Sequence, residues 1–105
     1  MSRMTKFLRQ SCSLEKYLVE EDGQPSMNAF GELQYQAPII LRCRHEMSHK
    51  DIQTANGSIV RSTSVYYLDE SEEIKADYRI DGCVILSAIS YVNGLGAIEG
   101  YEVYV

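Results

Sequence analysis

Tryptophan is absent from this chain of 105 residues and phenylalanine occurs only twice, whereas tyrosine occurs eight times. Tyrosine suits half-buried strand surfaces and protein interfaces, because its ring packs against apolar neighbours while its hydroxyl reaches a polar partner. The aromatic content therefore favours a β-rich domain whose tyrosines line a sheet, and some of them are candidates for contacts between subunits.

Cysteine is also scarce. Cys12, Cys43 and Cys83 are widely spaced and form no paired motif. An odd number of cysteines argues against a disulfide framework. We therefore expect a reducing compartment, in which these cysteines serve as small core residues.

Long apolar runs are missing as well. No run approaches the roughly 20 residues that a membrane span requires. The basic start, Met1–Gln10, lacks the apolar stretch and cleavage site of a signal peptide. A chain of this length supplies one modest core. The expected organisation is a flexible N-terminal arm over residues 1–11 and a single soluble domain over residues 12–105, with no membrane partner.

Basic residues are outnumbered, ten against fifteen acidic ones, which gives a net charge of −5 and argues against a dedicated nucleic-acid binder. The charge is uneven. Residues 42–61 carry four basic side chains and two acidic ones, whereas residues 69–81 carry six acidic and two basic. Opposed patches can join copies of a subunit head to tail, although ordinary solvated loops explain each patch equally well. The residues expected to make inter-subunit charge contacts are Arg42, Arg44, Arg61, Glu70, Glu72 and Glu73.

Catalytic motifs are few. No GxSxG nucleophile elbow and no glycine-rich phosphate loop before a helix occur. His45–His49 spells HExxH, which on a helix binds zinc through its histidines and activates water through its glutamate. However, a strand-like pattern precedes the motif, Arg44 and Lys50 flank it, and the chain has no third histidine. We expect a solvated loop, with no catalytic residue, metal or cofactor; a small zinc-dependent hydrolase is the alternative.

Strand alternation and tight turns dominate what is present. Ile39, Leu41 and Cys43 share one face of a predicted strand, with arginines on the other. Asn56-Gly57, Asp81-Gly82 and the stretch 93–96 are predicted turns. Residues 22–38 are predicted to be a loop, and residues 69–77 a loop or two turns of helix.

Five or six short antiparallel strands with such turns predict an all-β fold, either a small closed β-barrel or a compact sandwich, with a long inserted loop or hairpin. The final strand, Ala97–Val105, should fix the C-terminus in the sheet, with Tyr101, Val103 and Val105 facing inward. The predicted core comprises Leu41, Val65, Ile85, Ile89 and Val103, with Cys43 and Cys83 as unpaired apolar neighbours.

Several short segments follow one another in a recognisable order: Ser13–Tyr17, Ile40–Arg44, the polar stretch His45–Gly57, Ser62–Leu68, Ile74–Gly82 and Tyr101–Val105. In order and spacing they resemble the head-completion or stopper proteins of long-tailed phages (siphophages), also called minor capsid or head–tail connector proteins. The likeness runs from about residue 11 to the end. The acidic stretch 69–73 and the HEMSH motif depart from the family pattern.

The resemblance implies a structural virion protein, assembled in the host cytoplasm as a homo-oligomeric ring, sixfold or twelvefold, in the phage neck. The ring would bind an adaptor protein on the portal side and a tail terminator or tail tube protein on the tail side. It would close the DNA channel after packaging and provide the tail-docking surface.

The resemblance also implies that residues 45–62 form a long loop or hairpin that reaches toward the channel and holds packaged double-stranded DNA, while the remainder is scaffold. A polar, weakly basic tip can hinder a phosphate backbone without binding it tightly, because few phosphates are neutralised. The implied channel-loop residues are His45, Met47, His49, Lys50, Gln53, Thr54, Asn56 and Gly57.

Two further alternatives remain open. Within the phage class, the chain could be a tail terminator or another head–tail joining protein; an adaptor should contain more helix. Outside it, a protein-binding module with a Src-homology-3-like barrel would use the tyrosines to line an exposed aromatic groove.

Overall fold

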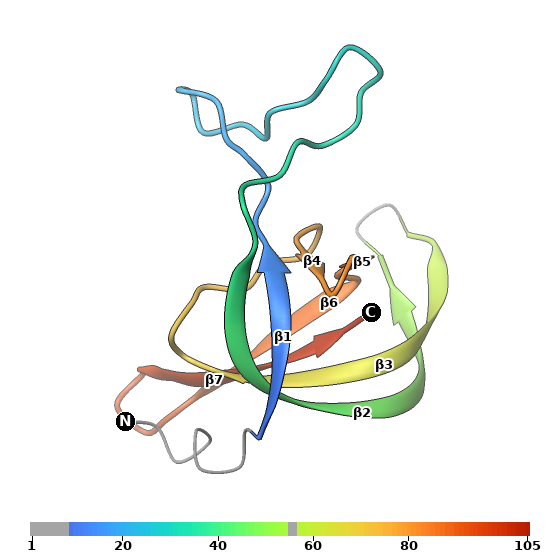
Figure 1. Cartoon of the computed structure of the whole chain (residues 1–105). Helices are drawn as coiled ribbons and strands as arrows, with labels where there is room; N and C mark the ends of the chain where they lie inside the picture. Colours follow the sequence, from blue (N-terminus) through green and yellow to red (C-terminus); the bar gives the residue numbers. More distant parts are fainter. Residues whose placement is uncertain (1–8, 55–56) are drawn as a thin grey trace.

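The computed structural model describes residues 9–54 and 57–105. They form one antiparallel sheet in the order β5-β4-β1-β2-β3-β7-β6 (Figure 1). The strands are β1 (Gln10–Glu15), β2 (Ile39–Gln53), β3 (Ile59–Asp69), β4 (Arg79–Ile80), β5 (Cys83–Val84), β6 (Ser87–Val92) and β7 (Ile98–Tyr104). These residues contain no helix, and so none with the length and hydropathy needed to cross a bilayer.

The predicted all-β class is confirmed, but the closed barrel is wrong: the sheet has seven strands and its two edges do not pair. The sheet stays open because residues 83–92, which lie between two turns in the sequence, are divided between its two edges as β5 and β6. β5 pairs with β4, and β6 pairs with β7. At the junction, Ile85 donates its N–H to Tyr78 O (2.8 Å), and Leu86 donates its N–H to Tyr104 O (2.8 Å). The chain thus steps from one edge of the sheet to the other without joining them.

Of the long loop or hairpin predicted at residues 45–62, the hairpin is the form adopted, and the described residues of this segment are the paired end of β2 and β3. Pairing continues to Met47↔Ser64 and resumes at Lys50↔Ser62. Ser48 and His49 together therefore face Thr63, which makes a β-bulge, the feature that bends a strand and increases its twist. Thr54 donates to Ser58 O at the tip (2.8 Å), and Ala55 and Asn56 lie outside the described residues.

The bent end of this hairpin turns toward the C-terminal strand. Lys50 Nζ lies 4.5 Å from the centre of the Tyr104 ring, and Ile52 packs with Val65 and Tyr104 in a small second cluster. The hydroxyl of Ser62, which is fully buried, lies 2.8 Å from the carbonyl oxygen of Val105. The hairpin is therefore part of the folded body and not an addition to it.

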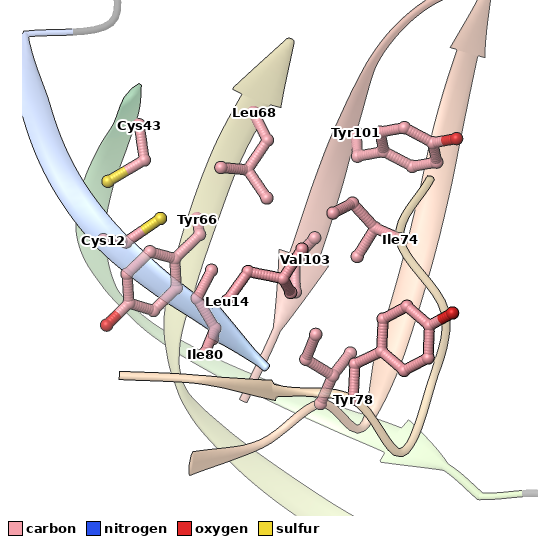
Figure 2. Packing of buried hydrophobic residues seen from close by; sticks show 11 residues of the cluster. Cys12, Leu14, Cys43, Tyr66, Leu68, Ile74, Tyr78, Ile80, Tyr101 and Val103 are labelled. Carbon is pink, nitrogen blue, oxygen red and sulfur yellow. The ribbon is translucent and has the colours of Figure 1, made fainter. Parts of the chain in front are cut away.

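The main core lies on the opposite face of the central strands (Figure 2). Its completely buried members include Leu14, Leu68, Ile80, Ile85 and Val103. The predicted burial of Val65, Ile85, Val103 and Cys43 is confirmed, and Leu41 is half-buried against the cluster.

Two core predictions are wrong: Ile89 is 42% exposed and Cys83 is exposed. Ile89 pairs with Glu102 and shares its face, which is the side of β7 opposite to Val103. Cys83 lies on a two-residue edge strand, where only β4 covers it.

The other two cysteines pack as expected. Cys12 and Cys43 are buried on neighbouring strands, with their sulfur atoms toward each other (Figure 2). Burial raises the pKa of both thiols, and for Cys12 the adjacent Cys43 raises it further. Both are free thiols in this structure.

Residues 16–38 form a projection that stands away from the sheet (Figure 1). Leu18 donates its N–H to Gln34 O (2.8 Å), Gln34 donates to Ser26 O (3.0 Å), and Ser26 donates to Leu18 O (2.7 Å). These bonds close a ring of three backbone segments. The turns between the segments have Gly23 and Gly31 at φ of 85° and 78°, a region that favours glycine. The predicted loop over 22–38 thus has only isolated bridges but a defined fold.

The base of the projection is fixed to the residues before β4. Tyr35 donates its hydroxyl to Asp77 O (2.9 Å), and its ring lies 3.8 Å from the guanidinium of Arg79. Tyr17 meets Tyr78 edge to face. Residues 70–77 are turns and irregular chain, so the looped form of this acidic segment is the one adopted.

The predicted boundary between an N-terminal arm and the domain falls inside a strand. β1 begins at Gln10 and pairs with Cys43, so residues 10 and 11 belong to the sheet. Residues 1–8 lie outside the described residues.

Candidate interaction surfaces

The residues predicted to line a channel lie along one bent ribbon. Most of their side chains are exposed, Met47 at 74%. Thr54 is half-buried, Gly57 is exposed at the turn with φ of 87°, and Asn56 lies outside the described residues. The ribbon therefore presents its polar residues mainly on paired strands, and of the described residues at its tip Thr54, Gly57 and Ser58 lie outside the strands. The exposed residues of this set are His45, Met47, His49, Lys50, Gln53 and Gly57.

The HEMSH residues lie on β2, where the helical spacing that brings two histidines to one zinc ion does not apply. The ring of His45 stacks on Tyr66, with centroids 4.3 Å apart and planes 6° apart. The bulge at Ser48 and His49 separates the second histidine from this stack. Within residues 9–54 and 57–105, no three His, Cys, Asp or Glu side chains form a metal-binding group.

Four of the six residues predicted to make inter-subunit charge contacts have ion-pair partners within the chain. Arg44 pairs with Glu46, and Arg61 Nε lies 3.4 Å from Asp51 Oδ1. The remaining two pairs belong to the acidic segment: Glu72 with Lys16 (2.7 Å) and Glu73 with Lys75 (3.8 Å).

The Lys16–Glu72 pair is half-buried and helps to hold the base of the projection, so Glu72 has a structural role inside the subunit. Arg42 and Glu70 are exposed. Of the six predicted charge contacts, these two have no ion-pair partner among the described residues.

Three tyrosines surround Glu102 on the face opposite the main core. Tyr67 is its register partner on β3, and Tyr91 and Tyr104 lie on β6 and β7. Burial, followed by hydrogen bonding to the Glu102 carboxylate, raises the pKa of Tyr91 and of Tyr104 to about 12. Burial and the negative charge of Glu102 also raise the pKa of Tyr67. The phenols stay protonated at neutral pH and act as donors to one carboxylate.

This use of the tyrosines leaves few of them accessible. Seven of the eight are buried or half-buried, and Tyr91 is 37% exposed. The exposed aromatic groove of a peptide-binding module would need several accessible rings. The structure places most of these rings in packing roles.

Sequence reasoning missed two apolar surfaces. The first is on the projection, where the exposed side chains are Leu18, Val19, Met27 and Phe30, the last at 87%. The eight-residue spacing of Gly23 and Gly31 was the available signal for its repeated turns.

The second missed surface is the free edge of β6. β6 is the last strand of the sheet and pairs with β7 alone among the described residues. No charged residue occurs between Asp81 and Glu99, and this absence was the signal in the sequence. The exposed apolar side chains along this edge and its turn are Ile89, Tyr91, Val92, Leu95 and Ile98.

Comparison with known proteins returned no matching family model, no matching curated protein and no matching solved structure.

Proposed function

We propose that this protein is a structural ring component of a tailed-phage neck, a head-completion or stopper protein that closes the DNA channel and offers a docking surface for the tail. The observation that carries the proposal is the order of the segments on which the resemblance depends. Ser13–Glu15, Ile40–Arg44 and Ser62–Leu68 lie on β1, β2 and β3. The last segment, Tyr101–Val105, includes most of β7.

The β2–β3 hairpin supports a role at a channel. It is the longest ribbon of the fold, and a bulge sets its direction. In the ring, the tip would contact DNA as a stiff element. Its two strands are paired as far as Gln53↔Ile59, and Thr54 then donates its N–H to Ser58 O. Asp51 lies beside Arg61, so the net positive charge near the tip is small. A weak phosphate interaction of this kind would retain DNA and still permit its release.

The distribution of surfaces supports assembly with other proteins. The projection and the edge of β6 expose apolar side chains at separate places on a small subunit. A neck ring has to contact its own copies and two different neighbours. The feature that favours a stopper over a tail terminator is the β2–β3 hairpin, because a channel gate requires an element that can extend into the channel.

The proposal is tested on tailed particles purified from cultures of the organism that carries the gene. We expect mass spectrometry to find the chain in these particles, and antibody labelling to place it at the junction of head and tail. Finding the protein only outside the particles, or on the capsid surface or tail tip, would overturn the assignment.

A further inference from the structure

We infer that the free edge of β6 is a self-pairing surface, on which two copies of this protein join antiparallel about a two-fold axis to form one continuous sheet. The inference concerns the subunit outside the neck and is independent of the proposed function. It depends on three properties of the edge: its open backbone, its lack of charge and its exposed apolar side chains.

Among residues 9–54 and 57–105, the backbone of β6 has a partner strand on one side only. Alternate residues of an antiparallel strand direct their N–H and C=O groups to opposite sides, and β7 takes only those on its own side. Natural edge strands are usually protected by charged side chains, by proline or by being very short. Residues 87–92 have neither charge nor proline and span six positions. The opposite edge, β5, has two residues and offers no comparable ladder.

The absence of charged residues on β6 points to a second copy of this chain as the partner strand. Two identical strands in antiparallel register bring the same residues close together, and like charges placed directly opposite destabilise a sheet. The subunit has a net charge of −5, and its 25 charged residues all lie outside 82–98. This edge is therefore the place where two acidic subunits can meet without opposing like charges. A basic partner protein would instead be expected to bind an edge that carries acidic side chains.

Symmetry restricts the register. A two-fold axis perpendicular to the sheet keeps each side chain on its own face. A residue of one copy can therefore lie opposite only the same residue of the other copy, or one an even number of positions away in the sequence. With Ser90 on the axis, Ile89 of each copy lies opposite Tyr91 of the other. Pairs between an aromatic and a β-branched residue are among the favourable cross-strand pairs. The pairing covers side chains that are 42% and 37% exposed in the single subunit.

The same register extends an existing cluster. Ile89 shares its face with Glu102, and Tyr91 is one of the three tyrosines around that carboxylate. The two copies would thus join their tyrosine clusters across the axis. Because an isologous contact is closed, this edge produces a dimer and leaves the projection and the β2–β3 hairpin free for other contacts.

The test is sedimentation equilibrium of the purified full chain and of matched lysine variants. We expect a dimer in the micromolar range, with a dissociation constant raised by at least about tenfold in Ile89→Lys, which is about 1.4 kcal/mol. Lysine at position 89 can pair with Glu102 in its own subunit, so folding should be retained. The control is Ile40→Lys, since Ile40 is 69% exposed on β2, a strand with neighbours on both sides.

A cross-linking experiment tests the register. Cys83, the exposed cysteine, is first replaced in Cys83→Ser. In that background, Ser90→Cys should form a disulfide-linked dimer on oxidation, and Ile40→Cys should not. The inference is overturned if the protein is monomeric up to millimolar concentration, if it forms larger rings by itself, if Ile89→Lys and Ile40→Lys behave alike, or if Ser90→Cys fails to cross-link.

Discussion

The hydroxyl of Tyr66 donates a hydrogen bond to the Asp81 carboxylate, with an O···O distance of 2.9 Å. The other carboxylate oxygen of Asp81 accepts from Ser13 N–H, and Asp81 N–H donates to Ser13 O, both at 2.8 Å. One residue of the β4–β5 turn thus connects β1 with β3 across the core. Asp81 and Gly82 both have positive φ, 49° and 81°, as a two-residue hairpin turn requires.

Removing the Tyr66 hydroxyl should therefore weaken the fold. We expect Tyr66→Phe to lower the free energy of unfolding by about 1–2 kcal/mol, because the buried ring remains and Asp81 loses one donor. Chemical denaturation measures this change. The matched control is Tyr17→Phe, which keeps the edge-to-face contact with Tyr78. Equal effects of the two substitutions would show that the Tyr66–Asp81 bond contributes nothing.

Between β5 and β6 the chain crosses from one edge of the sheet to the other. We therefore expect two isoleucines only four residues apart to differ strongly in their contribution to stability. Ile85 is 1% exposed and Ile89 is 42% exposed. Ile85→Ala should cost about 2–5 kcal/mol of unfolding free energy through lost burial and a residual cavity. Ile89→Ala, measured in the monomeric range of concentration, should cost less than about 1 kcal/mol. A comparable loss at both positions would mean that β6 presents its other face to the core.

Alkaline pH should destabilise the protein through the tyrosines around Glu102. The pKa of Tyr91 and that of Tyr104 rise from an ordinary value of 10.0 to about 12 in the folded state. In the unfolded chain these phenols lose their protons at a lower pH than in the folded protein. The stabilisation from the two protonated tyrosines is therefore complete below pH 10 and is lost as the pH rises through 12. Thermal melts between pH 9 and 12 should show a falling melting temperature.

Ultraviolet absorbance follows the ionisation of the eight tyrosines together, and no tryptophan overlaps the tyrosinate signal. Tyr104→Phe should reduce the alkaline loss of stability. If its melting temperature falls with pH as steeply as that of the parent protein, Tyr104 is not one of the groups responsible.

The projection should be dispensable for folding. Tyr17 and Tyr35 are bridge partners at its base. Replacing residues 18–34 by Asn-Gly would join them through a two-residue hairpin turn and keep both anchoring rings. The exposed apolar residues of the projection stabilise little, so we expect the melting temperature to change by less than about 5 °C. Circular dichroism measures this shift. A variant that fails to fold would show that the projection contributes to the core.

The hairpin tip should affect function more than stability. Ile52 and Val60 are register partners, and replacing residues 53–59 by Asn-Gly shortens the ribbon while keeping Ile52 in its cluster. The variant should fold, and particles assembled with it should lose packaged DNA or attach fewer tails. The matched control is Gln53→Ala, which leaves the ribbon at full length. Full infectivity with the shortened ribbon would contradict a gating role.

The sequence alone determined the local features of this protein. Alternation placed Ile39, Leu41 and Cys43 on the inner side of β2, and the outer positions between them are exposed. Asp81-Gly82 turns where predicted, and the turn at 93–96 is closed by Asn93, whose side-chain oxygen accepts from Leu95 N–H (2.8 Å). Such features are readable because they depend on a few neighbouring residues and their backbone preferences.

Only the tertiary structure decided which strands meet and which faces are covered. The run from Cys83 to Val92 looks like one strand, yet its halves pair with β4 and β7, because the curvature of the sheet brings both edges to the same stretch of chain. Periodicity gave Ile85 and Ile89 equal claims to the core, and only the arrangement of neighbouring strands separates them. The hairpin over residues 45–62 follows a local turn, but its bend depends on the β-bulge and its position on the hydrogen bond between Ser62 and Val105, neither of which a local pattern records.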